Sequence, residues 1–220
     1  MPIVGYILAV LIAYLLGSIP TGFLVAKARG IDIRSVGSGN IGATNVFRTL
    51  GKTAGVFVFL IDAAKGWLAV FVVAKLIAGW LYPTAGPLAL DWFAICSGVA
   101  AILGHNYTCW LYFKGGKGIA TSAGALFALV PWPLLIILAI WIVVFVFSRY
   151  VSLASISASF ALPFAAWLVG ESTAKVLVTA ALAALAIYKH KANIQRLLKG
   201  TENRIGVKKP LPSDAPNPIA

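Results

Sequence analysis

Long runs of apolar residues, separated by short polar segments, dominate this 220-residue chain. A helix needs about 20 apolar residues to cross the roughly 30 Å hydrocarbon core of a bilayer. Hydrophobic residues make up 60% of the chain and charged residues only 11%, whereas about a quarter of a soluble domain is charged. The chain is therefore predicted to be an all-α integral membrane protein whose outer surface faces lipid.

Seven apolar segments are candidate transmembrane helices. They are Ile3 to Ala26, Gly55 to Gly79, Leu90 to Trp110, Ile119 to Val130, Trp132 to Phe147, Ser152 to Val169 and Ala174 to Tyr188. The fourth and fifth are short and separated by Pro131 and Pro133, so they could instead form one kinked helix, leaving six spans. The Gly, Ala and Ser content of the fourth segment favours packing against other helices. Residues 1–204 are expected to form one domain, followed by a disordered, proline-rich tail over 205–220.

The distribution of Lys and Arg predicts the orientation of these helices. With seven spans, nearly all cations fall in one set of loops, and the opposite set keeps Lys175, with Lys75 near a helix end. The positive-inside rule then places the N-terminus outside, and the C-terminus and three long polar segments in the cytoplasm.

The net charge of +12 does not indicate that the protein binds nucleic acid, because the cations lie between apolar runs. Anionic head groups and phosphorylated substrates are the expected partners.

The first polar segment, residues 30–54, is rich in glycine and small hydrogen-bonding residues. It contains Ser35, Ser38, Gly39, Asn40, Thr44, Asn45 and Arg48. Residues 37–42 match the dinucleotide-binding fingerprint literally, but a membrane helix precedes them where the fingerprint requires a strand. Glycines let backbone N–H groups approach an oxyanion, and Arg48 offers a fork for phosphate. The segment is predicted to bind phosphate; the alternative is a flexible loop that contacts only lipid head groups.

The second polar segment, Phe113 to Thr121, stands immediately before a predicted helix. It contains Gly115, Gly116, Lys117 and Gly118. The Walker pattern is absent, yet the free N–H groups and the dipole at a helix N-terminus favour an anion. Lys117, between glycines, is the better anion ligand, and Lys114 suffices as a positive-inside anchor. The alternative is that the whole segment is an anchor with a flexible hinge.

The third polar segment, residues 190–204, contains His190, Asn193, Arg196 and Glu202. If the last span continues through it, His190 and Asn193 share one helical face. An amphipathic basic helix lying on the membrane surface is an equally good interpretation. Such a helix has no need of His190, Asn193 or Glu202, which keeps the functional interpretation open.

Isolated polar residues are less informative. His105 could be a ligand, a base or a structural histidine. Asp62 and Lys65, at i and i+3 inside a predicted span, are expected to neutralise each other. Ser152 begins the sixth span, where a serine most often caps the helix.

The sequence has no metal-ligand cluster and no catalytic carboxylate pair, so neither a metal nor a cofactor is expected. A site rich in hydrogen-bond donors but poor in bases suits a reagent that is already activated.

Together the three polar segments resemble those of one family, the bacterial acyl-phosphate:glycerol-3-phosphate acyltransferases of the PlsY type. The matching motifs are Ser38-Gly39-Asn40 through Thr44-Asn45 and Arg48, Gly104-His105 through Gly115-Gly116-Lys117-Gly118, and His190 through Asn193, Arg196 and Glu202. The stretches Tyr14 to Ile19 and Arg149 to Ser155 are also similar to family members. Each motif alone is modest, whereas the ordered set is specific.

The resemblance implies a seven-span enzyme of the bacterial inner membrane whose active site faces the cytoplasm, among membrane lipids. It would transfer a fatty acyl group from acyl phosphate to the 1-hydroxyl of sn-glycerol 3-phosphate. The products would be 1-acyl-glycerol 3-phosphate (lysophosphatidic acid) and phosphate, with neither acyl-CoA nor acyl carrier protein as the direct donor. Functional coupling to an enzyme that produces acyl phosphate is a further expectation.

On this hypothesis the catalytic residues are Ser38, Arg48, Lys117, His190 and Asn193. Substrate contacts are expected from Ser35, Gly39, Asn40, Thr44, Asn45, His105, Gly115, Gly116, Gly118, Thr121, Ser152, Arg196 and Glu202. The first segment would position glycerol 3-phosphate and the second would hold the acyl phosphate, although the two phosphates could be exchanged. Glu202 would pin the last segment by pairing with a cation.

The proton of the attacking hydroxyl has two possible acceptors on this hypothesis. The resemblance implies substrate-assisted catalysis, in which an acyl-phosphate oxygen accepts it, and His105 or His190 is the competing base.

A transporter or channel for organic phosphates is the alternative function. Transporters usually bind near mid-bilayer between paired repeats, and here the donors cluster at one face with no visible repeat.

Overall fold

The computed structural model describes residues 2–206, and all regular structure in this range is helical. The helices are α1 (Pro2–Ser18), α2 (Thr21–Lys27), α3 (Ala43–Leu50), α4 (Lys52–Leu68), a π-helical turn (Ala69–Val73), α5 (Ala74–Leu81), α6 (Pro87–Asn106), a 3₁₀ turn (Cys109–Leu111), α7 (Ile119–Leu129), α8 (Pro131–Ser148), α9 (Val151–Leu168), α10 (Thr173–Lys189) and α11 (Lys191–Leu198). The predicted all-α class is confirmed for these residues. The predicted tail, apart from its first two residues, lies outside the described range.

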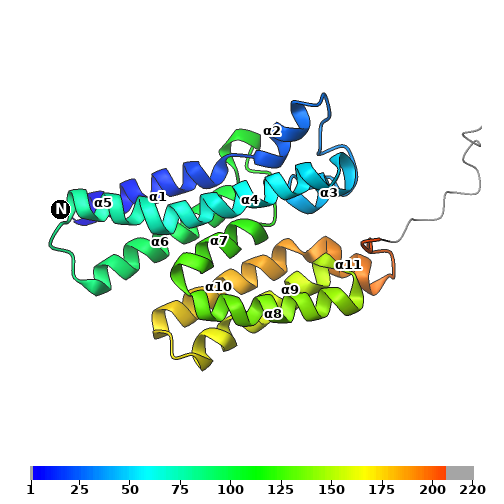
Figure 1. Ribbon diagram of the computed structural model, residues 1–220. Coiled ribbons are helices and arrows are strands. Elements are labelled where there is room, and N and C mark those ends of the chain that lie inside the picture. Colours follow the sequence, from blue (N-terminus) through cyan, green and yellow to red (C-terminus); the bar gives the residue numbers. More distant parts are fainter. Residues whose placement is uncertain (1, 207–220) are drawn as a thin grey trace, which may run out of the picture.

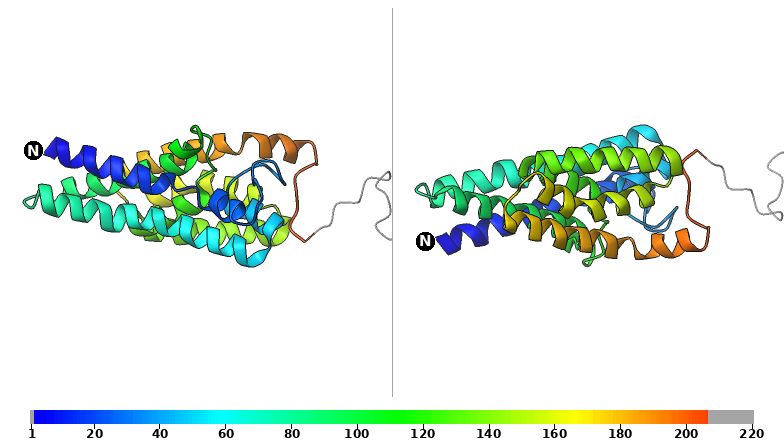
Figure 2. Two further views of the ribbon diagram at one scale, coloured as in Figure 1. Left: turned by 90° about the horizontal axis from the view of Figure 1, so that it is seen from above. Right: turned by 90° about the horizontal axis from the view of Figure 1, so that it is seen from below.

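The helices form two groups that run side by side (Figure 1). In the first group α1 packs along α6, and α4 continues through the π turn into α5. In the second group α9 packs against both α8 and α10, and α7, which lies along α4, stands between the groups. The N-terminus lies at one end of the bundle, and α2, α3 and α11 lie toward the other end (Figure 2). The first and third polar segments are therefore near neighbours.

Within residues 2–206, five stretches are long and apolar enough to cross a membrane: Ile3–Lys27, Lys52–Leu81, Pro87–Leu111, Pro131–Ser148 and Val151–Leu168. Their outward side chains, such as Leu135 and Val143 of α8, are exposed and apolar, as lipid contact requires. α10 has 17 residues, and at 1.5 Å per residue it extends about 26 Å. α7 has 11 residues and extends only about 16 Å. The predicted crossing Ile119 to Val130 is thus incomplete in α7 alone, and the count of seven spans stays a prediction.

Prolines interrupt the helical conformation at two places in the predicted spans. The alternative of one kinked helix across Pro131 is wrong, because Val130 leaves the helical conformation (φ −146°, ψ 70°) and α8 starts afresh at Pro131. The predicted first span is likewise interrupted, since Pro20 has no N–H to continue α1 beyond Ser18. Carbonyls freed at this break accept hydrogen bonds from Lys65 and Thr108.

α7 approaches α4 closely through glycine. A Cβ added at Gly124 would collide with the backbone of Ala63, and one added at Gly66 would collide with the backbone of Thr121. Small residues at these points let the two backbones come together where larger side chains would hold them apart. The predicted packing of this short, Gly- and Ala-rich helix against a neighbour is confirmed.

This contact predicts opposite effects of one substitution at two helical glycines. Gly124→Ala should destabilise the purified protein in detergent by about 1–3 kcal/mol, because the added methyl group has no room. Gly79→Ala is the matched control: nothing lies within 4 Å of a Cβ there, and alanine is favoured over glycine in a helix by about 1 kcal/mol. Thermal unfolding followed by tryptophan fluorescence measures both, and an equal change in Tm for the two variants would contradict the close α4–α7 contact.

Candidate active site

The three polar segments meet around a cavity of about 670 Å³. Its walls are formed by α3, α4 and α7 on one side and by α8, α9 and α10 on the other. Its polar end is lined by Ser38, Asn40, Thr44 and Arg48 from the first segment, Lys117 and Gly118 from the second, and His190, Asn193 and Glu202 from the third. The rest is lined by apolar side chains that include Leu126, Ile137, Trp141, Phe145, Leu162 and Leu182.

The first segment is a folded loop held by one buried side chain. Asn45 Nδ2 lies 2.9–3.2 Å from three carbonyl oxygens of the loop, those of Ile33, Val36 and Asn40. Asn45 Oδ1 accepts the backbone N–H of Ser38 at 2.9 Å. Asn45 lines the cavity, and its predicted contact with substrate stays a prediction, while its amide is engaged by the loop. Its part in the site is to hold Ser38 at the cavity wall.

The second segment folds back on the end of α6. The N–H groups of Gly115 and Gly116 donate to the carbonyls of Asn106 (3.2 Å) and His105 (3.0 Å), so these two glycines do not offer their N–H groups to an anion. Gly118 precedes α7 with φ +77°, a left-handed conformation that glycine adopts without strain. The donors left free are those of the first turn of α7, because N–H groups there lack intrahelical acceptors. Ile119 in that turn lines the cavity.

Glu202 ties the third segment to α9 and, through Asn193, to Lys117 of the second segment. Its Oε1 accepts from Ser152 Oγ (2.8 Å) and Asn193 Nδ2 (2.7 Å), and its Oε2 accepts from Arg196 Nε (2.6 Å). The cation that the sequence predicted for Glu202 is therefore Arg196. Asn193 Oδ1 in turn accepts from Lys117 Nζ at 2.6 Å. Burial raises the pKa of the Glu202 carboxyl, but the hydrogen bonds from Asn193, Arg196 and Ser152 outweigh it and hold that pKa below its usual value.

The charge on the cavity wall is set by partial burial. Burial lowers the pKa of Lys117 to about 8, with Arg48 and Arg196 adding to the effect and Glu202 opposing it. Burial, assisted by the charge of Lys117, lowers the pKa of His190 to about 4. His190 is therefore neutral at pH 7. Its Nδ1 lies 2.8 Å from the carbonyl oxygen of Ala186, which can only accept, so Nδ1 carries the proton and Nε2 keeps its lone pair.

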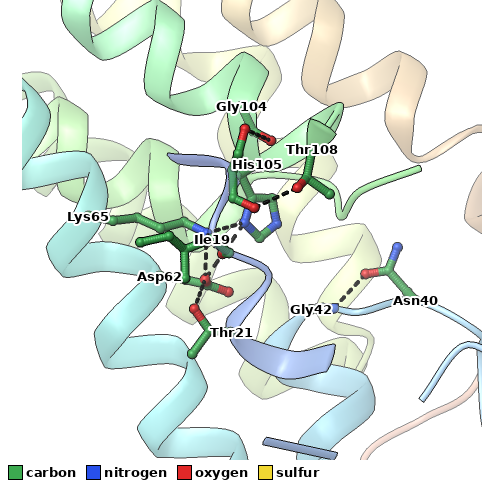
Figure 3. Close-up of polar contacts among 10 residues, drawn as sticks. Ile19, Thr21, Asn40, Gly42, Asp62, Lys65, Gly104, His105 and Thr108 are labelled. Atoms are coloured by element: carbon green, nitrogen blue, oxygen red, sulfur yellow. Dashed lines mark hydrogen bonds and ion pairs between the residues drawn. The ribbon is translucent and has the colours of Figure 1, made fainter. Parts of the chain in front are cut away.

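A buried ion pair lies beside the second segment (Figure 3). Lys65 Nζ is 2.8 Å from Asp62 Oδ1, and the two side chains are 3% and 2% exposed, which confirms the expected pairing. Thr21 Oγ1 also donates to Asp62 Oδ1, at 3.0 Å. His105 belongs to the same cluster, with its Nδ1 2.9 Å from Lys65 Nζ. Sequence reasoning left His105 without a carboxylate because its neighbours come from α4, a different helix.

Four predicted substrate contacts lie outside the wall of the main cavity, and their contact with substrate stays a prediction. Ser35 is exposed and its hydroxyl donates to the carbonyl of Asp32, while Gly39 is exposed beside it. Thr121 is fully buried, and its neighbour Ser122 lines the cavity instead. Arg196 is paired with Glu202.

A smaller cavity of about 280 Å³ adjoins the same loops. Asn40, Gly115, Gly116 and Lys117 line it, together with Tyr107, Tyr188, Lys189 and Lys191, which sequence reasoning did not select. Asp62, Ser122 and the apolar wall of the main cavity were missed as well. Hydropathy could not have found the apolar wall, because a side chain that faces a cavity between helices is as apolar as one that faces lipid.

Comparison with known proteins identifies the family. The family described as glycerol-3-phosphate acyltransferase matches residues 7–200. This chain belongs to the glycerol-3-phosphate acyltransferase family. It is 47% identical to the glycerol-3-phosphate acyltransferase of Endomicrobium trichonymphae, over 91% of this chain and 96% of that relative. Identity to the enzyme of Aquifex aeolicus is 42%, over 89% of this chain and 96% of that relative.

Solved structures agree with this assignment. The crystal structure of PlsY (YgiH), an integral membrane glycerol 3-phosphate acyltransferase, in its glycerol 3-phosphate form gives a TM-score of 0.80 at 42% identity, over 91% of this chain and 96% of that one. Its lysophosphatidic acid form gives a TM-score of 0.78 at 41% identity, over 91% and 95%. The resemblance to the PlsY type is confirmed, and the protein is an integral membrane acyltransferase of phospholipid biosynthesis.

The lowered pKa of Lys117 predicts how anion binding by this acyltransferase depends on pH. The ammonium is charged below a pH of about 8 and loses its charge above it, so sulfate, whose own charge is constant here, should bind more weakly as pH rises through that value. Isothermal titration at several pH values measures this. In Lys117→Arg the decline should vanish, because a guanidinium stays charged. Lys114→Arg, at an exposed position outside both cavities, is the control, and an unchanged decline in Lys117→Arg would contradict the assignment.

Proposed function

We propose that this acyltransferase uses acyl phosphate as its donor and acylates the 1-hydroxyl of sn-glycerol 3-phosphate. The products are 1-acyl-glycerol 3-phosphate and inorganic phosphate, the first acylation of phospholipid synthesis. The observation that carries the proposal is one cavity that joins a cationic polar end, with Arg48 and Lys117, to an apolar passage between α7, α8, α9 and α10. A donor with a phosphate head and a fatty tail matches both parts of this cavity.

The chemistry requires little of the protein because acyl phosphate is a mixed anhydride. The hydroxyl oxygen of glycerol 3-phosphate forms a bond to the acyl carbonyl carbon, the bond between that carbon and the phosphate oxygen breaks, and phosphate leaves. Negative charge grows on the carbonyl oxygen and on the leaving phosphate. Cations and N–H donors fixed beforehand stabilise that charge without having to reorganise. Lys117 and the free N–H groups at the start of α7 supply such an environment.

Two phosphates need two sets of donors. We assign the acyl phosphate to the second segment, with Lys117 and the first turn of α7, and glycerol 3-phosphate to Ser38, Thr44 and Arg48. Arg48 donates to the carbonyl of Asn203 at 3.2 Å, so its guanidinium is already aimed across the cavity toward the third segment. The exchanged assignment stays an alternative, and separate KM values for the two substrates in Arg48→Lys and Lys117→Arg distinguish the two.

The leaving phosphate is the proposed proton acceptor. His190 faces the cavity with a free lone pair on Nε2, but with a pKa of about 4 it is a weak base near neutral pH. It is suited to accept a hydrogen bond from the attacking hydroxyl and so to orient it, together with Asn193. A phosphate oxygen of the donor then takes the proton as the carbon–oxygen bond breaks, which makes the catalysis substrate-assisted.

The proposed location is the bacterial inner membrane, with the N-terminus outside and the site on the cytoplasmic side. The gathering of most Lys and Arg residues in the segments around the site supports this orientation. In this arrangement α7 and α10 complete seven crossings, and residues 1–204 act as one domain. In this proposal the acyl-phosphate donor enters the cavity from the lipid bilayer along the apolar passage. We therefore expect functional coupling to an enzyme that produces acyl phosphate.

The proposed activity can be tested directly with purified protein. Palmitoyl phosphate and glycerol 3-phosphate should yield inorganic phosphate and lysophosphatidic acid in equal amounts, followed by phosphate release and mass spectrometry. Palmitoyl-CoA and palmitoyl-loaded acyl carrier protein, tested in parallel, should give no product. Turnover with either of these alone would overturn the donor assignment. Uptake of glycerol 3-phosphate into proteoliposomes without any acyl transfer would indicate a transporter.

Replacing each histidine tests the acceptor of the proton. His190→Gln should lower kcat by about tenfold or less, the loss of one positioning hydrogen bond rather than of a base. The pH dependence of kcat should keep its shape, because the leaving phosphate and not the imidazole takes the proton. A loss of about a thousandfold in His190→Gln or His105→Gln, together with the disappearance of an ionisation from the pH profile, would show that a histidine is the base.

A further inference from the structure

The buried Lys65 ammonium has a definite hydrogen-bond count. An ammonium group carries three N–H donors and no lone pair. Three acceptors surround Lys65 Nζ: Asp62 Oδ1 at 2.8 Å, the carbonyl oxygen of Ile19 at 2.9 Å and His105 Nδ1 at 2.9 Å. Each proton therefore has one partner, and the Lys65–His105 contact is possible only if His105 Nδ1 accepts. The proton of the neutral His105 ring must then lie on Nε2.

Because Lys65 makes the hydrogen bond to His105 Nδ1, the direction of that bond is the reverse of the one in the usual carboxylate–histidine pair. When a carboxylate contacts a histidine directly, the ring donates Nδ1–H and Nε2 is left as an acceptor, the arrangement of a general base. Here Asp62 Oδ1 is 3.7 Å from His105 Nδ1, beyond hydrogen-bond distance, and Lys65 Nζ contacts both atoms, at 2.8 Å and 2.9 Å (Figure 3). His105 is thereby prepared to donate a hydrogen bond and has no free lone pair with which to act as a base.

The nitrogen that carries the proton, His105 Nε2, lies against the second polar segment. The second ring nitrogen of His105 faces away from the ion pair (Figure 3). A Cβ added at Gly116 would collide with Nε2, which places this nitrogen directly against the second polar segment. His105 also lines the main cavity, and within residues 2–206 its Nε2 makes no hydrogen bond. A donor held in place but without a partner, next to Lys117, suits an anionic oxygen.

We propose that the Asp62–Lys65 pair fixes His105 as the Nε2–H tautomer, and that this N–H donates to an oxygen of the phosphate group bound at the second polar segment. Lys65 and Asp62 are positioning residues in this account, since they act only through His105. His190 has the opposite tautomer: its Nδ1–H donates to the carbonyl of Ala186, and its Nε2 is left as an acceptor. The cavity thus holds one imidazole that donates and one that accepts. The identity of the anion as phosphate rests on the proposed function, and the tautomer does not.

The tautomer can be observed without any assay of activity. The chain has only two histidines, so full-length protein labelled with ¹⁵N-histidine gives two sets of ring resonances, and His190→Gln leaves the set of His105. We expect Nε2 to show a protonated, pyrrole-type ¹⁵N signal and Nδ1 an unprotonated, pyridine-type signal at neutral pH. Addition of inorganic phosphate should shift the Nε2 signal. A protonated Nδ1, or a doubly protonated ring, would overturn the proposal.

Two amide substitutions separate donation to the anion from simple support of Lys65. Gln places its amide nitrogen about as far from the backbone as Nε2, so His105→Gln keeps the donor and gives up the acceptor for Lys65. Asn reaches only as far as Nδ1, so His105→Asn keeps an acceptor for Lys65 and loses the donor. We expect inorganic phosphate to bind roughly 10- to 100-fold more weakly to His105→Asn, as for a lost hydrogen bond to a charged group. His105→Gln should recover most of that loss.

The outcomes are distinct. The reverse ranking, with His105→Asn binding phosphate normally and His105→Gln weakly, would mean that His105 only supports the ion pair, and the proposal fails. If the tautomer and the ranking are as expected but palmitoyl phosphate gives no turnover, the donor assignment fails while the role of His105 stands. Circular dichroism and gel filtration in detergent establish that both variants fold as the parent does.

Discussion

A polar group inside the hydrocarbon layer of a membrane has no water with which to form hydrogen bonds, so its partners must come from the protein itself. The organisation of this protein follows from that constraint. The helical bundle satisfies its backbone internally, and where Pro20 interrupts the first span, Lys65 and Thr108 donate to the carbonyls left free. Lys65 is itself neutralised by Asp62, and its third N–H donates a hydrogen bond to His105 Nδ1. The repair of one helix break thus fixes the orientation of an imidazole at the edge of the substrate cavity.

The same constraint shapes the other end of the cavity. Glu202 accepts three hydrogen bonds that tie α9 and α11 together, and through Asn193 it reaches Lys117. A substrate phosphate can replace Asn193 as the partner of Lys117, because a full negative charge attracts an ammonium more strongly than an amide oxygen does. The carboxylate that holds the site together is engaged by three donors and so repels an incoming anion less than a free one would.

Much of this arrangement was accessible from sequence alone. The all-α class, the positions of the apolar helices, the neutral pairing of Asp62 and Lys65 and the choice of Lys117 over Lys114 all follow from periodicity, composition and local spacing. Asn45, Thr121 and Ser35 were chosen for their residue type; in the structure the Asn45 amide is engaged by its own loop, Thr121 is fully buried and Ser35 is exposed. One residue of difference along a helix rotates a side chain by about 100°, which is why Ser122 and not Thr121 reaches the cavity.

The sequence by itself determined that this chain folds in a membrane and that its cations and small donors gather in three segments, because hydropathy and charge act residue by residue along the chain. It also determined the family, because the ordered motifs are specific. Only the tertiary structure decided which side chains face one another. His105 of α6 meets Asp62 and Lys65 of α4, Lys117 meets Asn193 of α11, and apolar side chains from α7, α8, α9 and α10 line one passage. Contacts between distant segments depend on packing and hydrogen-bond satisfaction in three dimensions, which no local pattern in the chain encodes.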